Sequence, residues 1–322
     1  MMKIFMFEVF QEEQKYLNKF LAGISDIGYS AKTIQESGLD LCPGQIISIR
    51  TQSVIPRRWK DYFLGALTRS QGYDHLSRYR QETNSTAVFG YLENYCSRAV
   101  AEHALMNMLM IFRKYKQQQC QFPGFQRDGI TGHELRNKKA VVFGVGQIGL
   151  ELARMLKGLE MQVKGVDIVE RSHEIPYTDL SAGLAWADVF FCCASLTGET
   201  NGVLTYERLR TMPKGASLIN VARGEIIPID GIKRLLEEDH FLGVALDVFP
   251  EEGLLANTLR ANEAVSHPTH KLIMEMSDDP RVIVTPHNAF NTQESTERKA
   301  QQTAESIKHF LKTRNFVYNI TE

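Results

Sequence analysis

The chain lacks any uncharged apolar run near the ~18 residues that a membrane span requires. Its opening MMKIFMFEVFQEEQK holds one short apolar segment that meets Glu and Gln at once, so it predicts a first strand rather than a signal peptide. Basic runs are also missing and the formal net charge is −1. We therefore expect neither a membrane nor a nucleic acid as a partner.

Cysteine is scarce. Five occur, an odd number without a Cys-x-x-Cys pair: Cys42, Cys96, Cys120, Cys192 and Cys193. This usage favours a reducing, cytoplasmic setting over a disulfide framework. His267 and His270 form a His-x-x-His motif in a polar segment, but no cysteine or carboxylate accompanies them at metal-binding spacing. We therefore predict no metal site.

The remaining composition is typical of a globular protein, with 43% apolar and 23% charged residues over 322 positions. That length exceeds one ordinary core, so two domains are expected. Short apolar runs alternate with helical patterns, which predicts an α/β protein with parallel sheets. Strands are expected in 3–10, 44–50, 63–74, 140–146, 162–168, 188–195, 216–222, 241–249 and 281–287. Helices are expected in 11–22, 97–117 and 292–313, the last capped by Asn291 with Glu294.

A glycine-rich turn follows the strand expected at 140–146. Gly144, Gly146 and Gly149 form GxGxxG ahead of an amphipathic helix, and Asp167 ends the next strand. The interval 167 − 149 = 18 is close to the ~20 residues typical of a dinucleotide fingerprint. Asp167 should accept hydrogen bonds from both ribose hydroxyls and repel a 2′-phosphate. The pattern predicts NAD as the cofactor.

Three chemically capable residues end three successive strand signals: Arg223, Glu252 and His287. Ligands of open α/β sheets bind beyond the carboxyl ends of the strands, so these side chains are expected to share one cleft. A guanidinium can hold a carboxylate with two hydrogen bonds. A histidine moves a proton near neutral pH, and a neighbouring carboxylate orients it. With a hydride carrier, the set predicts reversible reduction of a 2-oxo acid.

At this point the sequence resembles the D-isomer-specific 2-hydroxyacid dehydrogenases over nearly its whole length. The motifs that carry the resemblance are TRSQGYDHL, YCSRAVAEHAL, FGVGQIG, INVARGE, GVALDVFPEE and VIVTPH. The resemblance implies a Rossmann-type NAD-binding domain (103–290) inserted into a smaller flavodoxin-like substrate domain (1–102 and 291–322). It also implies a homodimer.

The resemblance implies further roles. The catalytic Arg, Glu and His of the family fall on Arg223, Glu252 and His287, and its carboxylate-binding loop falls on Gln71 and Gly72. The cofactor contacts that carry over are Gly146, Gln147, Ile148, Asp167, Ala222 and Asp247, the last meeting the nicotinamide amide. His103 is expected to be a hydrogen-bonded interior or interface histidine.

The substrate side chain stays open. Tyr95 and Phe290 match aromatic positions of the D-lactate dehydrogenase branch, which favours a small or apolar substrate such as pyruvate. Arg50 instead matches a strand end of phosphoglycerate dehydrogenases and could recognise a second anionic group, as in a phosphoglycerate or glyoxylate/hydroxypyruvate-type reductase. A non-enzymatic, NAD-sensing corepressor is a further alternative. Formate dehydrogenases resemble the family but carry Gln where this chain has Glu252.

Overall fold

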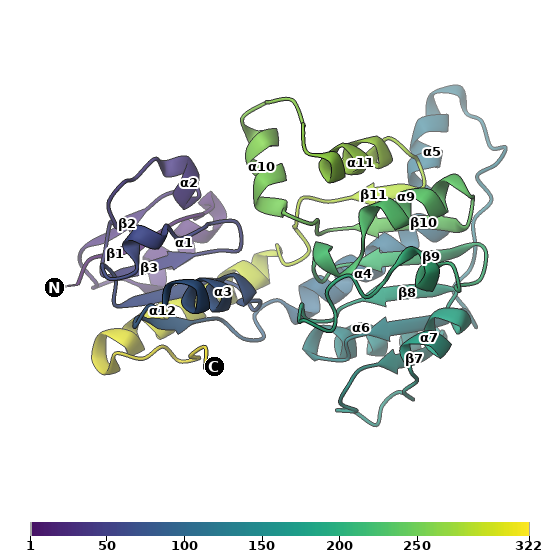
Figure 1. Ribbon diagram of the computed structural model, residues 1–322. Helices are drawn as coiled ribbons and strands as arrows, with labels where there is room; N and C mark the ends of the chain where they lie inside the picture. The colour runs from purple at the N-terminus through teal and green to yellow at the C-terminus, as the bar shows by residue number, and fades with distance from the viewer. Residues whose placement is uncertain (1, 322) are drawn as a thin grey trace. The chain divides into compact units, whose positions relative to one another are not determined.

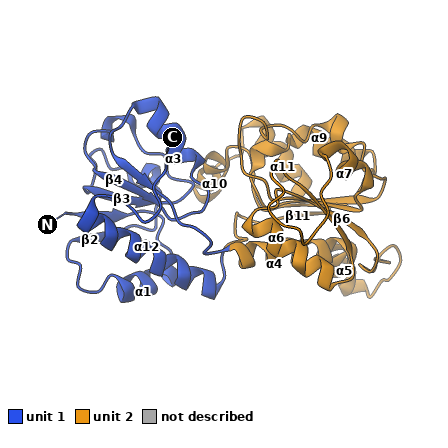
Figure 2. Ribbon diagram, turned by 90° about the horizontal axis from the view of Figure 1, so that it is seen from below, with its two compact units in different colours: residues 1–96, 291–322 blue, residues 97–290 orange. Residues whose placement is uncertain are grey.

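The computed structural model describes residues 2–321, which form two compact units. The first unit contains the chain up to Cys96 and again from Asn291 onward, and the second is the continuous segment Ser97–Phe290, as Figure 2 shows in two colours. The first boundary therefore lies at Cys96 rather than at residue 102. The reason is that helix α4 (Ser97–Phe112) packs as a whole on α6 (Gln147–Gly158) and on the second sheet.

The first unit is built on a parallel five-stranded sheet in the order β2-β1-β3-β4-β5. This is the flavodoxin-like order, with its switch point between β1 and β3. The strands are β1 Ile4–Met6, β2 Ile27–Tyr29, β3 Ile46–Ile49, β4 Gly65–Thr68 and β5 Val88–Gly90. The helices are α1 Gln11–Phe20, α2 Ile34–Ser37, α3 Asp74–Thr83 and α12 Gln293–Thr313, and α1 and α12 lie side by side (Figure 1).

The second unit holds a parallel six-stranded sheet in the order β11-β10-β9-β8-β6-β7. A bridge between Gly165 and Tyr177 stands where a third strand of a dinucleotide fold would pair with β7. Its strands are β6 Lys139–Phe143, β7 Gln162–Val166, β8 Val189–Cys192, β9 Ala216–Asn220, β10 Phe241–Leu246 and β11 Val282–Val284. Its other helices are α5 Tyr115–Gln121, α7 Leu180–Trp186, α8 Tyr206–Leu209, α9 Ile229–Glu237, α10 Glu252–Arg260 and α11 Pro268–Ser277.

The strand runs are mostly apolar because both faces of each sheet are covered. Every residue of β3, β4, β8 and β9 is buried, as expected of parallel strands between helices. Helix α9 carries one apolar stripe, and Ile232, Leu235 and Leu236 from that stripe enter the core of the second unit. Among residues 2–321, no helix is both long and apolar enough to cross a membrane.

Two local predictions were wrong. The helix expected over 97–117 ends at Phe112, and α5 begins at Tyr115 after Lys114 adopts a left-handed backbone with φ 49°. The break lets the Lys116 ammonium donate to three carbonyls beside β11, those of Ser277, Asp279 and Val282. The cap of α12 is Thr292 rather than Asn291, because the Thr292 hydroxyl accepts the amide of Ser295.

Candidate active site

The glycine-rich turn has the close packing that a dinucleotide site needs. Gly144 has φ 91°, and a Cβ there would overlap the backbone of Ala194. A Cβ on Gly149 would overlap the Gly144 carbonyl, so this glycine lets α6 approach β6. A Cβ on Gly146 would meet nothing within 4 Å, and Gly146 and Gln147 are exposed at the start of α6. An open helix N-terminus of this kind suits a pyrophosphate.

Asp167 closes this turn from the end of β7. One carboxylate oxygen accepts the amide of Val145 at 2.7 Å, and the other accepts that of Val169 at 3.1 Å. Each carboxylate oxygen has a further lone pair, so ribose hydroxyls can still bind. Ile148 is half-buried in the first turn of α6. The residues present therefore fit NAD.

Arg223 is presented by a short turn after β9 that Asn220 holds. The Asn220 side chain accepts the amide of Ala222 and donates to the carbonyl of Arg223, both at 3.0 Å. Asn220 is 1% exposed, so both bonds lie in the interior. The Arg223 backbone is extended, and its guanidinium donates to the Ala222 carbonyl at 2.8 Å. A buried amide thus fixes the backbone from which the guanidinium projects.

The small size of Gly224 serves packing within the chain rather than access for a ligand. Small neighbours of an arginine could leave room for a ligand, but a Cβ on Gly224 would overlap the backbone of Phe249 and Pro250. The space is filled by the chain itself. The glycine therefore lets the turn that carries Arg223 pack against the segment that leads into Glu252.

His287 and Glu252 form a direct pair. The Nδ1 atom of His287 lies 2.8 Å from both carboxylate oxygens of Glu252. The two side chains are 21% and 17% exposed, so the contact is only partly screened by water. A carboxylate at Nδ1 accepts a hydrogen bond from the N–H group of the ring. This fixes the orientation of the imidazole and makes Nε2 the nitrogen for proton exchange.

The backbone of His287 is left-handed, with φ 50°, and Asp247 holds it there. The Asp247 carbonyl accepts the amide of His287 at 2.9 Å. The Asp247 carboxylate accepts the amides of Asn288 (2.8 Å) and Ala289 (3.0 Å). A left-handed non-glycine residue costs about 1–3 kcal/mol and persists where its surroundings fix it. Asp247, which the resemblance assigns to the nicotinamide amide, is thus also an internal brace for the histidine loop.

His103 extends this brace from helix α4. The Thr285 hydroxyl donates to Asp247 at 2.6 Å, so it accepts from Nε2 of His103, 3.1 Å away. Burial lowers the pKa of His103, and this effect outweighs that of the Asp247 carboxylate, which acts to raise it. The lowered pKa favours the neutral ring. The expectation of a hydrogen-bonded interior histidine is confirmed.

Phe290 is 6% exposed and its ring meets the edge of the His287 ring, with centroids 6.3 Å apart. It therefore forms an apolar flank beside the imidazole. The structure brings Glu252, His287, Phe290 and Asp247 together in the second unit, where the Arg223 turn packs against the segment before Glu252.

The other predicted substrate residues belong to the first unit. Gln71 and Gly72 follow β4 in a half-buried loop, and Ser70 closes the loop by donating to the Gly72 carbonyl at 2.7 Å. Within residues 2–321, the backbone amides of Gln71 and Gly72 donate no hydrogen bond. Two adjacent amides without acceptors are available to bind an anion.

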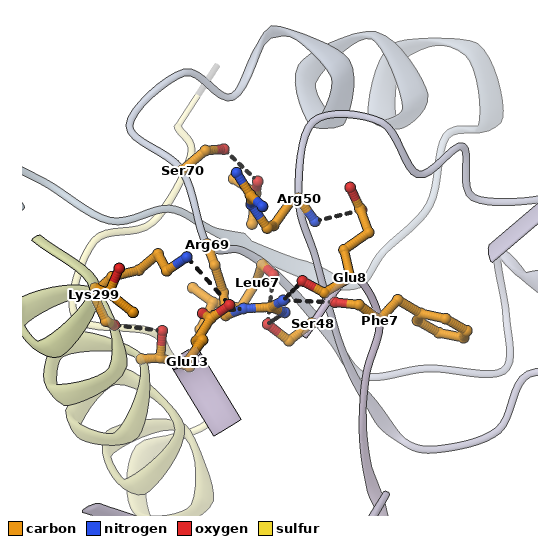
Figure 3. A network of polar contacts seen from close by, with 12 residues as sticks. Phe7, Glu8, Glu13, Ser48, Arg50, Leu67, Arg69, Ser70 and Lys299 are labelled. Carbon is orange, nitrogen blue, oxygen red and sulfur yellow. Dashed lines mark hydrogen bonds and ion pairs between the residues drawn. The ribbon is translucent and has the colours of Figure 1, made fainter. Parts of the chain in front are cut away.

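A buried ion network underlies this loop. Arg69 is fully buried and donates to Glu13 (3.0 Å), to the Ser48 hydroxyl and to the carbonyls of Phe7 and Glu8. Lys299 of α12 reaches the other oxygen of Glu13 at 3.2 Å. Figure 3 shows Glu13 between the two cations. Arg69 thereby ties the end of β4 to α1, β1 and β3.

Burial and neighbouring charges shift the pKa values within this network in opposite directions. Burial raises the pKa of Glu13, but Arg69 and Lys299 outweigh it and lower that pKa from 4.5 to about 2. Burial, with Arg50 and Arg69, lowers the pKa of Lys299 from 10.5 to about 7 against the pull of Glu13. The Glu13 carboxylate is therefore firmly ionised.

Arg50 follows β3 at the switch point of the first sheet. Its amide donates to the buried Glu8 carboxylate at 2.9 Å, and its guanidinium lies 4.5 Å from the centre of the Phe10 ring. Tyr95 is 3% exposed, and burial raises the pKa of its hydroxyl well above the usual range. The structure thus places Tyr95 in the interior of the unit and Arg50 at the switch point of its sheet.

Sequence reasoning missed the supporting residues. Asn220 acts through hydrogen bonds to the turning backbone that carries Arg223, whereas Arg69 and Glu13 act through a side-chain contact between distant segments. A local signal existed for two of them. A polar Asn220 inside the apolar run SLINVA and an arginine at once after GALT both break a buried pattern, and such residues require internal partners.

Comparison with known proteins agrees with the family and the fold. Residues 103–289 match the family of the D-isomer-specific 2-hydroxyacid dehydrogenase NAD-binding domain. A D-specific alpha-keto acid dehydrogenase of Enterococcus faecalis is 29% identical over 245 residues, 76% of this chain and 74% of that protein. A glyoxylate reductase of Thermofilum pendens is 30% identical over 257 residues, 76% of this chain and 71% of that one.

Among solved structures, a D-lactate dehydrogenase from Aquifex aeolicus, complexed with NAD and lactic acid, superposes with a TM-score of 0.87. It is 26% identical, and the match covers 99% of this chain and 100% of that one. The predicted family resemblance, the α/β fold and the NAD cofactor are confirmed. The chain belongs to the D-isomer-specific 2-hydroxyacid dehydrogenases and is an NAD-dependent oxidoreductase.

Proposed function

We propose that this protein interconverts a 2-oxo acid and its D-2-hydroxy acid, with a small, pyruvate-like side chain as the preferred substrate. The observation that carries the proposal is the 2.8 Å pair of His287 and Glu252 in the same unit as the Arg223 turn. A paired imidazole can deliver a proton to a ketone oxygen. A guanidinium can bind the neighbouring carboxylate.

Each residue then has one task. Arg223 binds the substrate carboxylate and polarises the carbonyl. His287 gives its Nε2 proton to that oxygen during reduction and takes it back during oxidation, while Glu252 offsets the positive charge on the ring. Asp247 and Asn220 hold the backbones of these groups and are positioning residues. The open amides of Gln71 and Gly72, in the first unit, are suited to an anionic group.

NAD, when bound, supplies or accepts the hydride. Gly144, Gly146 and Gly149 shape the turn that would hold its pyrophosphate, with the amides of Gln147 and Ile148 at the start of α6. Asp167 would bind the adenine-side ribose and exclude a 2′-phosphate. Ile168, fully exposed beside it, offers apolar cover for an adenine face. Comparable kcat/KM with NADH and NADPH would refute this role of Asp167.

We infer from the position of Phe290 that the side chain of the substrate is small and apolar. Its ring stands against His287, so the group next to the reacting carbon meets an apolar surface. A methyl group, as in pyruvate, suits such a surface better than a carboxylate does. Tyr95, in the interior of the first unit, gives that unit an aromatic core rather than an open polar wall.

Arg50 supports a second candidate, a reductase for dianionic 2-oxo acids of the phosphoglycerate or hydroxypyruvate type. It stands at the β1/β3 switch point, where ligands of open sheets bind.

A substrate panel separates the two. NADH oxidation would be measured against pyruvate, glyoxylate, hydroxypyruvate, phenylpyruvate, oxaloacetate and phosphohydroxypyruvate, in wild type and in Arg50→Gln. We expect pyruvate to have the highest kcat/KM and Arg50→Gln to leave it within a few-fold. A preference for the dianions that Arg50→Gln abolishes would establish the second candidate instead. The matched control is Arg58→Gln, an exposed arginine of the same unit.

We also propose a homodimer that works in the cytoplasm. The proposal rests on the family resemblance and on five cysteines without a disulfide in the described chain. Light scattering on the purified protein tests the assembly, and a monomeric mass would overturn it.

A further inference from the structure

Three side chains with metal-binding atoms gather beside the turn before α10. One of them, Glu251, directly precedes Glu252 in the sequence. Glu251, His267 and His270 each offer one ligand atom, and these atoms lie within 4.8 Å of one another. Nε2 of His267 is 3.2 Å from a carboxylate oxygen of Glu251, and the two imidazole rings have centroids 4.6 Å apart. None of the three has a part in the proposed reaction.

In the folded chain, Glu251 supplies the carboxylate that is absent near His267 and His270 in the sequence. His267 directly precedes α11 and His270 lies in its first turn, so the i, i+3 spacing puts both rings on one side of the helix. Glu251 comes from the turn before α10, where its backbone is left-handed with φ 51°. The prediction of no metal site considered only spacing along the sequence and did not take this contact between distant segments into account.

The separation of the groups suits one ion. Two ligands held at about 2.1 Å in a tetrahedral site lie about 3.4 Å apart, close to the His267–Glu251 distance. Nε2 of His270 contacts the Pro250 carbonyl at 3.1 Å, so it donates there and leaves the lone pair on Nδ1. Metal-binding histidines commonly donate their second nitrogen to such a carbonyl.

A second observation concerns His267. Its Nδ1 atom is buried and has no hydrogen-bond partner among residues 2–321, while Nε2 faces Glu251. A ring used only as a hydrogen-bonding group would be expected to satisfy both nitrogens. His270 is 1% exposed, so one ligand is rigidly held and the other two can adjust around it.

We propose that Glu251, His267 and His270 form a binding site for a divalent transition-metal ion, with Zn²⁺ as the representative ion. Two imidazoles and one carboxylate are a donor set that Zn²⁺, Ni²⁺ and Cu²⁺ accept and that Mg²⁺ does not favour. Water completes the coordination.

Binding there would reach the reaction. The ion would tie the turn before α10, which carries Glu251, to the start of α11 and so restrain the backbone from which Glu252 projects. We expect this restraint to slow the reaction. This consequence rests on the proposed role of the pair, whereas the binding itself does not.

Binding is tested on the full-length protein, stripped of metal and titrated with Zn²⁺ against a chromophoric chelator. We expect one tight ion per chain in wild type and affinity lower by at least about 10-fold in His267→Gln and in Glu251→Gln. His309→Gln, an exposed histidine of α12, should bind as wild type does. Absence of tight binding, or equal binding by all four proteins, would overturn the site.

Cobalt gives a readout independent of activity. Co²⁺ in wild type should show the visible absorption of a four-coordinate site, and His270→Gln should lose it. If that variant is unfolded by circular dichroism, the His267→Gln spectrum decides. For the consequence, Zn²⁺ should slow wild-type reduction reversibly on chelation and spare His267→Gln. Inhibition that persists in His267→Gln would overturn the link to this site.

Discussion

Gly224 and Phe249 lie so close that a side-chain carbon on residue 224 would overlap the carbonyl carbon of Phe249. This contact joins the turn that presents Arg223 to the segment that leads into Glu252. Gly224→Ala should separate the two segments and lower kcat/KM by about 100-fold, as expected for a displacement near 1 Å. NADH binding, followed by fluorescence, should change little. Gly158→Ala, where a Cβ meets open space, is the control. Near-normal kinetics in Gly224→Ala would contradict the coupling.

Arg223→Lys tests the guanidinium itself. A lysine keeps the charge but cannot form two parallel bonds, so kcat/KM should fall ~30- to 1000-fold, or about 2–4 kcal/mol. NAD affinity should stay near wild type. Arg208→Lys, at an exposed arginine whose side chain donates to the Val203 carbonyl, serves as the matched control. A variant with near wild-type kcat/KM would remove Arg223 from the carboxylate site.

Glu252→Gln tests the partner of His287. Without the carboxylate, the protonated ring loses its counter-charge, so oxo-acid reduction should be slower and its pH–rate profile should move to lower pH. Glu251→Gln is the adjacent control and should leave the metal-free profile in place. An unmoved profile in Glu252→Gln would show that the carboxylate does not assist the histidine.

Glu13→Gln addresses the stability of the first unit. It leaves Arg69 and Lys299 buried without their anion and should cost on the order of 3–5 kcal/mol in urea unfolding. The folded-state pKa of Glu13 is lowered from 4.5 to about 2, so its contribution is present above pH 4.5 and is lost as pH falls toward 2. The variant should lack this part of the acid dependence. Glu12→Gln, exposed on the same helix, should unfold as wild type does.

Much of the fold could be predicted from the sequence because the patterns that specify it are local. Apolar runs of strand length, the three glycines and Asp167 lie within short windows, so the sheets and the dinucleotide turn could be predicted. The three residues proposed to act in catalysis were also accessible, since Arg223, Glu252 and His287 each close a strand signal. In the structure two of them meet at 2.8 Å, although they are 35 positions apart.

What could not be predicted depends on contacts between distant segments. No local pattern shows that Gly224 faces Phe249, that Arg69 meets Glu13, or that Glu251 reaches His267. The end of α4 was missed for the same reason, because Lys116 finds its carbonyls near β11. Left-handed backbone at His287 is likewise set by Asp247 and not by the preference of histidine.

The split first unit has a consequence for synthesis. Residues 97–290 form a continuous unit that can complete its sheet as soon as they emerge, whereas Glu13 must wait for Lys299 near the end of the chain. The inserted unit should therefore mature first on the ribosome, with the earliest residues left open until last. A chain that stops after Phe290 should yield a protease-resistant core from 97–290 and a digested N-terminal part. Equal resistance of both parts would contradict this order.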